Sequence, residues 1–246
     1  MKLLLIIIIG NDKASVVKIV KIISVIIILL VNTNPAISQS YDKGLDAAKT
    51  GDYNTAIDIF LPLAETNNAL AQEMLGLIYE QGLGVQKDYA KAFKWTQLAA
   101  QQGLPDAQNR LGGLHLRGLG VPENRSKAMK WYELASKQGH LAALTNQGVI
   151  FLLSENLEKA AEIYKISASR GDTRAQFSLG VMYEKGIGLE QSNILAFMWY
   201  DLSSFQGYEA AFSSRDILIK VMNKEDISIS RNMARKCLSS SYKKCD

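Results

Sequence analysis

Hydrophobic residues recur at helical spacing along much of this chain. In the segment from residue 71, Ala71, Leu75 and Ile78 fall on one face of a helix, because residues three or four positions apart lie side by side there. A second apolar face follows at Ala92 and Trp95. Glycines and polar residues separate the two faces, so we expect two helices joined by a turn.

The whole pattern returns at a fixed spacing along the chain. Well-formed copies begin at Ala71, Ala107 and Ala175, and each contains a Leu-Gly pair in the first helix and a Gly-x-Gly turn. The three tryptophans of the sequence all occupy one phase of the second helix: Trp95, Trp131 and Trp199. Repetition at this period is typical of helical repeat arrays. We therefore predict a tandem array of helix pairs.

A shorter copy begins at Ala143. Gly148 matches the glycine of the Leu-Gly pair, but the Gly-x-Gly turn is absent. The next copy starts at Ala175, four positions sooner than the spacing from Ala71 to Ala107 predicts. Those four positions are missing from the turn. We expect the helix stacking to change locally around residues 149–156.

Two kinds of glycine recur in phase. Gly76 and its counterparts lie inside the first helix, where glycine is unfavourable by about 1 kcal/mol relative to alanine. Their recurrence predicts the close approach of a neighbouring helix. Gly82 and Gly84 follow the helix and suit the positive φ of a helix C-cap and turn.

The recurring motif resembles the Sel-one-like repeat, a relative of the tetratricopeptide repeat. It reads Ala-x3-Leu-Gly-x2-Tyr-x2-Gly-x-Gly-Val-x6-Ala-x2-Trp-x3-Ala-x3-Gly. The resemblance implies an all-α fold: an α-solenoid of antiparallel helix pairs with C-terminal capping helices, of the type found in exported bacterial members. Asn223, three residues before Asp226, is a candidate N-cap for the last helix.

These observations divide the chain into seven predicted segments. They are a signal peptide (1–38), an N-terminal helical hairpin resembling an incomplete tetratricopeptide-type pair (39–70), repeat 1 (71–106), repeat 2 (107–142), the shortened repeat 3 (143–174), repeat 4 (175–210) and the C-terminal capping helices (211–246).

The resemblance also implies a role in protein–protein interaction, as a scaffold or adaptor that binds a protein or peptide. Solenoids present an extended concave surface to their partners. We expect exposed positions of the first helices to line it. The candidate partner-binding residues are Gln72, Glu73, Gln108, Asn109, Arg110, Arg117, Gln176, Ser178 and Lys185.

The N-terminus has the layout of a secretory signal. Basic residues precede an apolar run from Ile22 to Val31, and a small-x-small triplet, Ala36-Ile37-Ser38, follows. The apolar run is about half of the roughly 20 residues that a membrane span needs. We expect cleavage near Ser38 and a periplasmic or extracellular protein with no transmembrane anchor in the mature chain. The alternative is an uncleaved membrane anchor.

The two cysteines, Cys237 and Cys245, both lie close to the C-terminus. In an oxidising compartment such a pair closes a loop by a disulfide, which we expect from the predicted export. The alternative is two free thiols near a frayed terminus.

Net charge argues against nucleic-acid binding. The segment 1–38 carries four lysines and one aspartate, so it contributes most of the formal charge of +4. The remainder is nearly neutral and lacks the basic footprint of a nucleic-acid binder.

Few residues suggest chemistry. His115 occupies the tyrosine phase of its repeat, which favours a packing role, and neither His115 nor His140 has a Cys or carboxylate at ligand spacing. We predict no catalytic residue, no metal site and no cofactor.

A second hypothesis is a cell-wall or β-lactam hydrolase, because cysteine-rich relatives in the family are linked to β-lactam hydrolysis. Ser240, Ser241 and Lys243 give a Ser-x-x-Lys-like spacing, and residues 49–51 read Lys-Thr-Gly. In penicillin-recognising enzymes the serine of the first motif opens a helix, and the second motif lies on a strand. Here the first motif falls in the C-terminal tail and the second at a predicted helix–turn junction, and the cysteine pair that marks each repeat of those relatives is absent. A structural role in an envelope assembly is a third option.

Overall fold

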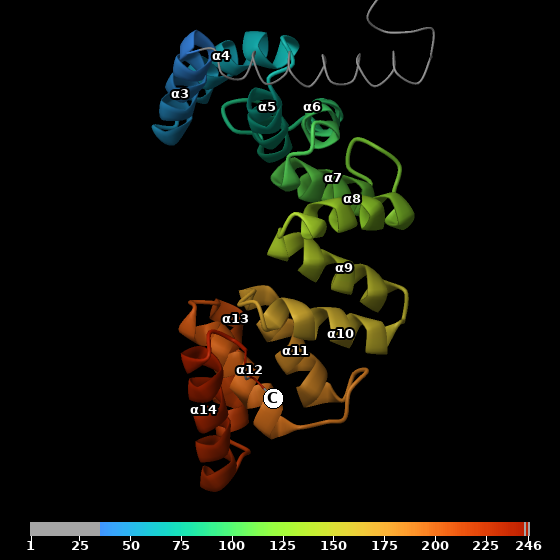
Figure 1. The fold of residues 1–246 in the computed structure, drawn as a ribbon, viewed down its shortest axis with the longest axis vertical. Helices are drawn as coiled ribbons and strands as arrows, with labels where there is room; N and C mark the ends of the chain where they lie inside the picture. The colour runs from blue at the N-terminus through green and yellow to red at the C-terminus, as the bar shows by residue number, and fades with distance from the viewer. Residues whose placement is uncertain (1–34, 244, 246) are drawn as a thin grey trace, which may run out of the picture. The chain divides into compact units, whose positions relative to one another are not determined.

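The chain is an all-α solenoid, as the sequence predicted. A computed structural model describes residues 35–243 and 245, and every regular element in that part is a helix (Figure 1). The chain divides into two compact units, one ending at Ala99 and one beginning at Ala100. The predicted leader lies outside the described residues up to 34, and its last four residues belong to the first described helix.

The first unit contains two helix pairs. Their helices are α3 (Pro35–Lys49), α4 (Tyr53–Glu65), α5 (Ala69–Gln81) and α6 (Tyr89–Gln101), of which α6 continues two residues past the unit boundary. Phe60, Leu75 and Ile78 are fully buried in its core, and Trp95 is nearly so. The predicted apolar faces thus pack against each other.

The second unit continues the pattern and closes it. Its helices are α7 (Pro105–Arg117), α8 (Arg125–Lys137), α9 (Leu141–Leu153), α10 (Leu157–Ala168), α11 (Thr173–Lys185), α12 (Asn193–Phe205), α13 (Glu209–Ile219) and α14 (Lys224–Ser239). Helices α7 to α12 form three antiparallel pairs. Helices α13 and α14 both pack against α12, and make few contacts with each other. Asn223 caps α14 by accepting a hydrogen bond from the Asp226 amide, as predicted.

Mid-helix glycines allow the two helices of each pair to approach closely. A Cβ on Gly112, Gly148 or Gly180 would lie 2.6 Å from a tyrosine ring of the second helix. This confirms the predicted close approach. The rings belong to Tyr132, Tyr164 and Tyr200, which immediately follow the tryptophan phase of their repeats.

The N-terminal hairpin shares this packing, which the sequence analysis missed. A Cβ on Gly44 of α3 would lie 2.6 Å from the ring of Phe60 on α4. The separation of Gly44 and Phe60 along the chain equals that of Gly148 and Tyr164 in the shortened repeat. The hairpin is therefore a second short helix pair of the same design.

Both short pairs receive the turn of the following repeat. In the shortened repeat only residues 154–156 connect α9 to α10, and Glu155 has a φ of 58°. A Cβ on Gly188 would lie 2.5 Å from the carbonyl group of Leu157, the first residue of α10. Gly84 is similarly close to Tyr53, the first residue of α4. The Gly-x-Gly turn thus occupies the space left by the short connection.

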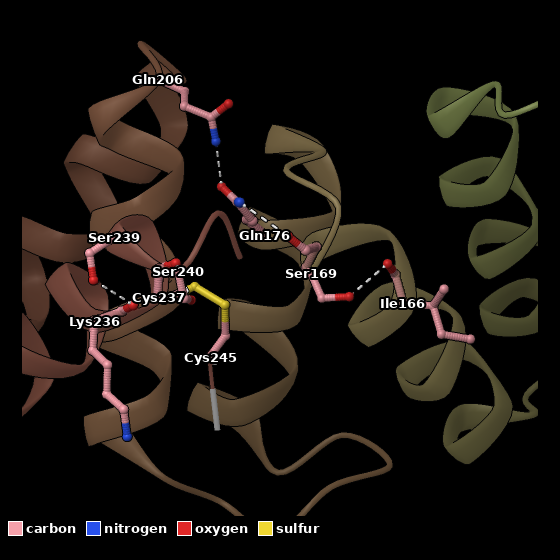
Figure 2. The surroundings of a disulfide bond; sticks show 10 residues. Ile166, Ser169, Gln176, Gln206, Lys236, Cys237, Ser239, Ser240 and Cys245 are labelled. Atoms are coloured by element: carbon pink, nitrogen blue, oxygen red, sulfur yellow. Dashed lines mark hydrogen bonds between the residues drawn. A yellow bond between two sulfur atoms is a disulfide. The ribbon is translucent and has the colours of Figure 1, made fainter. Parts of the chain in front are cut away.

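The C-terminal tail folds back onto the second unit. Positive φ angles at Ser241 and Tyr242 reverse the chain after α14, and a disulfide joins Cys237 to Cys245 (Figure 2). Cys237 and Cys245 are both buried in a core formed mainly by α10, α11 and α12, and Tyr242 packs beside them. None of the described helices has the length and apolarity needed to span a membrane.

Candidate partner-binding surface

Three of the predicted binding residues are buried, so the expectation that they are exposed is wrong. The relative exposure of Gln72, Gln108 and Gln176 is at most 4%. Each occupies the second position of its repeat and turns its side chain toward the end of the preceding helix. Their amide groups form hydrogen bonds with the preceding helix.

The buried glutamines bond the last carbonyls of the preceding helices. Gln176 Nε2 donates to the Ala168 carbonyl at 3.2 Å and its Oε1 accepts from Gln206 at 2.8 Å (Figure 2). Gln108 makes the same two contacts, with the Ala100 carbonyl and with Gln138. A helix C-terminus leaves carbonyls without intrahelical donors, and the glutamine supplies one. We call this arrangement the glutamine relay.

The remaining six predicted residues are divided between the two units. Glu73 is half-buried on α5 in the first unit. Lys185 is exposed at the end of α11 and pairs with Glu184 at 2.7 Å. The other four, Asn109, Arg110, Arg117 and Ser178, lie on α7 and α11 in the second unit.

Those four residues belong to a polar surface that crosses three first helices, namely α7, α9 and α11. Position by position, Arg110, Asn146 and Ser178 correspond in their repeats. We call this surface the arginine face, and it consists of Asn109, Arg110, Arg117, Asn146, Arg174 and Ser178.

Hydrogen bonds between helices hold the arginine face together. Asn146 of α9 donates to Oδ1 of Asn109 on α7 at 2.8 Å. Arg174 of α11 reaches back to the Ala142 carbonyl on α9 at 3.4 Å. The Ser178 side chain interacts with the Tyr164 hydroxyl on α10 and lowers its pKa. These contacts order side chains that would otherwise lose rotamer freedom on binding.

Two buried tyrosines place their hydroxyls beneath this surface. Burial raises the pKa of Tyr132 to about 12, although the positive charges of Arg117 and Arg174 favour ionisation. Burial also raises the pKa of Tyr164 to about 12, against the Ser178 hydrogen bond and the charge of Arg174. Both hydroxyls therefore stay protonated at neutral pH. Arg174 lies within electrostatic reach of both.

The sequence did not predict Asn146, Arg174, Tyr132 and Tyr164 as surface or supporting residues. The tyrosines carried a signal, because each follows the tryptophan phase of its repeat. Asn146 could have been found as the counterpart of Arg110 in the next repeat. Arg174 precedes the alanine that opens its repeat, and no recurring residue marks that position.

The two histidines have structural surroundings. His115 is 4% exposed, and burial together with the charge of Lys127 lowers its pKa. His140 caps α9, since its Nδ1 accepts from the Ala143 amide, and its Nε2 lies 3.1 Å from Asp106. Within residues 35–243 and 245, no cluster of metal-ligating side chains is present.

The serine–lysine motif of the hydrolase hypothesis ends a helix. Ser240 is the C-cap of α14, and its hydroxyl donates to the Cys237 carbonyl at 2.8 Å. Lys49 and Thr50 lie at the end of α3 in the other unit. Neither motif has the helix-opening or strand placement that the chemistry of those enzymes requires.

Known proteins share both the repeat and the fold. The Sel1 repeat model matches residues 69–104, 105–140, 141–172 and 173–208. Each match starts two residues before the alanine that opens the corresponding predicted repeat. A search among curated proteins gave no match.

Solved structures give the same result. A Sel1 repeat protein from Oxalobacter formigenes is 30% identical, with a TM-score of 0.58 over 70% of this chain and 72% of the other. A protective antigen of uropathogenic Escherichia coli is 24% identical, with a TM-score of 0.52 over 84% and 55%. An immunity protein from Pseudomonas aeruginosa is 23% identical, with a TM-score of 0.51 over 85% and 81%. The last two establish the fold alone.

The helix pairs and their recurring motif define a helical repeat protein of the solenoid class, which typically serves as a non-catalytic scaffold. More particularly, the chain belongs to the Sel1 repeat family. Proteins of this family are generally scaffolds for protein–protein interaction.

Proposed function

We propose that this chain is an exported protein-interaction module that binds a partner through the arginine face. The observation that carries the proposal is the ordering of that face by bonds between α7, α9 and α11, centred on Asn146 and Arg174. A preordered polar surface loses less conformational entropy on binding than a flexible one. Arginine is also enriched at protein interfaces.

The proposed location is the periplasm or the exterior of a bacterial cell. Two features support it: the leader-like sequence of segment 1–38 and the Cys237–Cys245 disulfide. Disulfides persist in oxidising compartments. We further propose that the protein acts without catalysis, as the placement of Ser240 at a helix end supports.

Copurification from the native compartment tests the proposal. Tagged wild-type chain, an Arg174→Glu variant and a Lys130→Glu variant are each crosslinked in the cell envelope, and the captured proteins are identified. Lys130 is an exposed lysine of α8 outside the arginine face. We expect one partner to be captured by the wild type and Lys130→Glu and lost from Arg174→Glu. Equal capture by all three, or no protein above background, would refute the arginine face as the binding surface.

A further inference from the structure

The capping helices leave a groove that the arginine face does not use. Helices α13 and α14 both pack on α12 but hardly touch each other. Two hollows of about 440 and 410 Å³ lie along the gap between them. Arg235 of α14 lines both hollows, so they adjoin at this residue, and we call the two together the capping groove.

One end of the capping groove is apolar. Phe212 of α13 and Leu238 of α14 line the larger hollow. Phe212 is 42% exposed, so a partner can reach it. An apolar side chain from a partner could be buried between them, and burying one fully contributes about 1.5–3 kcal/mol.

The other end is basic. Lys224, Arg231 and Arg235 line the smaller hollow together with Ile227, and none of its lining residues is acidic. No ion pair within the described part of the chain engages these three cations. Arg231 lies over the Phe197 ring at 5.9 Å, and Arg235 donates to Asn232. The positive charge of this end is therefore available to an anionic partner.

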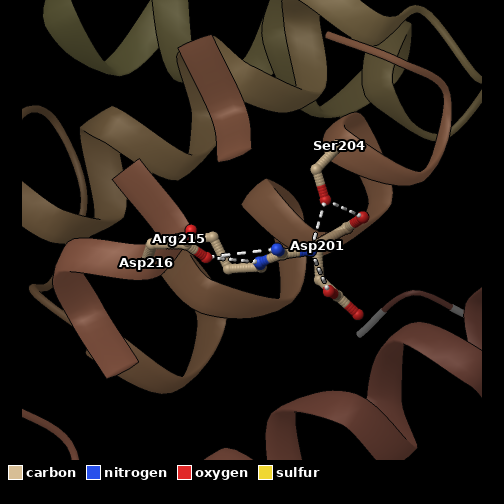
Figure 3. Close-up of polar contacts among 4 residues, drawn as sticks. All are labelled: Asp201, Ser204, Arg215 and Asp216. Atoms are coloured by element: carbon tan, nitrogen blue, oxygen red, sulfur yellow. Dashed lines mark hydrogen bonds and ion pairs between the residues drawn. The ribbon is translucent and has the colours of Figure 1, made fainter. Parts of the chain in front are cut away.

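A fourth cation, Arg215, is already neutralised. Its guanidinium lies 3.4 Å from Asp201 and 3.1 Å from Asp216, and it donates to Ser204 at 3.0 Å (Figure 3). These contacts join α13 to α12. Arg215 therefore holds α13 against α12 at the apolar end of the groove and adds little net charge there.

We propose that the capping groove binds an acidic segment of a partner protein that carries an apolar anchor residue. Charge complementarity selects the occupant: carboxylates would pair with Lys224, Arg231 and Arg235, and the anchor would enter between Phe212 and Leu238. The chain's own segment 1–34 does not fit, because it carries four lysines and one aspartate. An extended segment fits a groove between two helices better than a flat anionic surface does.

Binding of a synthetic peptide tests this inference independently of the arginine face. The probe is a short fluorescein-labelled peptide rich in Glu and Asp with a central Phe-Leu pair, followed by fluorescence anisotropy. One control peptide replaces the acids by lysine, and the other replaces Phe-Leu by Ala-Ala. We expect saturable binding of the probe only, weakened when salt rises from roughly 0.05 to 0.5 M, because the Debye length then falls severalfold.

Matched variants locate the binding. Arg231→Glu combined with Arg235→Glu is expected to weaken probe binding by at least about tenfold, because the groove would then repel the acidic peptide that it had attracted. Lys236→Glu is the control, because Lys236 is exposed on the same helix and lines neither hollow. Circular dichroism checks folding. If the double variant does not fold, Lys224→Glu combined with Arg235→Glu replaces it.

Four results would overturn the inference. They are the absence of saturable probe binding, equal binding by the double variant, binding of anionic phosphatidylglycerol vesicles but not of the probe, and a dimer by sedimentation that the double variant dissociates. Loss of probe binding with unchanged capture of the arginine-face partner would separate the two proposals.

Discussion

The amide of Gln206 donates a hydrogen bond of 2.8 Å to Gln176, which itself donates to the Ala168 carbonyl. Gln176 thereby joins the C-cap of α12 to the last residue of α10. Gln176 is fully buried, so water does not readily replace its bond to the Ala168 carbonyl. Gln176, which the sequence suggested as a partner-binding residue, therefore has a structural role.

Replacing Gln176 by leucine should destabilise the fold. The change leaves the buried Ala168 carbonyl without its side-chain donor, and a buried unsatisfied group costs about 1–3 kcal/mol. The free energy of unfolding, measured in urea, is expected to fall by that amount. Gln101→Leu, at an exposed position, should change it by less than about 0.5 kcal/mol. Equal effects of the two variants would contradict the structural role of the relay.

The close approach of Gly180 to Tyr200 predicts that alanine at position 180 destabilises the protein, although alanine is usually favourable inside a helix. A Cβ on Gly180 would lie 2.6 Å from the Tyr200 ring, and that ring is held by a 2.7 Å bond from its hydroxyl to Glu184. We expect Gly180→Ala to lower the melting temperature through a loss of about 1–3 kcal/mol.

Gly113 supplies the matched control for this prediction. Its nearest atoms, on Arg117 and Tyr132, would lie 3.6 and 3.7 Å from a Cβ, which is ordinary contact. Gly113→Ala should stabilise the helix by up to about 1 kcal/mol. Similar melting temperatures for the Gly113→Ala and Gly180→Ala proteins would show that the close approach does not govern the glycine.

The disulfide should stabilise the folded tail. Cys237 and Cys245 are eight residues apart, and closing so short a loop in the unfolded chain contributes about 2–3 kcal/mol. We expect Cys245→Ser and the addition of reductant each to lower the melting temperature of the wild type. The Cys245→Ser protein should not respond to reductant, and a wild type equally stable with and without reductant would argue against this contribution.

Burial of His115 predicts a pH dependence. Its pKa is lowered from 6.5 in the folded chain, so the unfolded chain takes up the proton first as the pH falls. The free energy of unfolding should therefore decrease below about pH 6.5 and level off above it. His115→Tyr, which restores the residue found in this phase at Tyr79 and Tyr183, should flatten this slope. If urea titrations at pH 5.5 and 7.5 give the same change in the free energy of unfolding for the variant and the wild type, His115 is not the source of the pH dependence.

Periodicity predicted the helices and their contacts well, because Leu75, Gly76 and Trp95 recur in phase and each has one packing role. Exposure was harder to predict. Gln72 is polar and lies beside apolar residues, and only the position of the preceding helix shows that its amide is buried. The arginine face escaped prediction for a related reason: Asn146 and Arg174 share no residue type, and only the stacking of α9 and α11 brings them together.

The most direct test of the account places a photo-crosslinking amino acid at position 174 and, in a second protein, at position 130. Both chains are irradiated in their native compartment, and crosslinked products are identified by mass spectrometry. Binding at the arginine face predicts one partner protein crosslinked at position 174 and absent at position 130. The same products at both positions, or products at position 130 alone, would contradict binding at the arginine face.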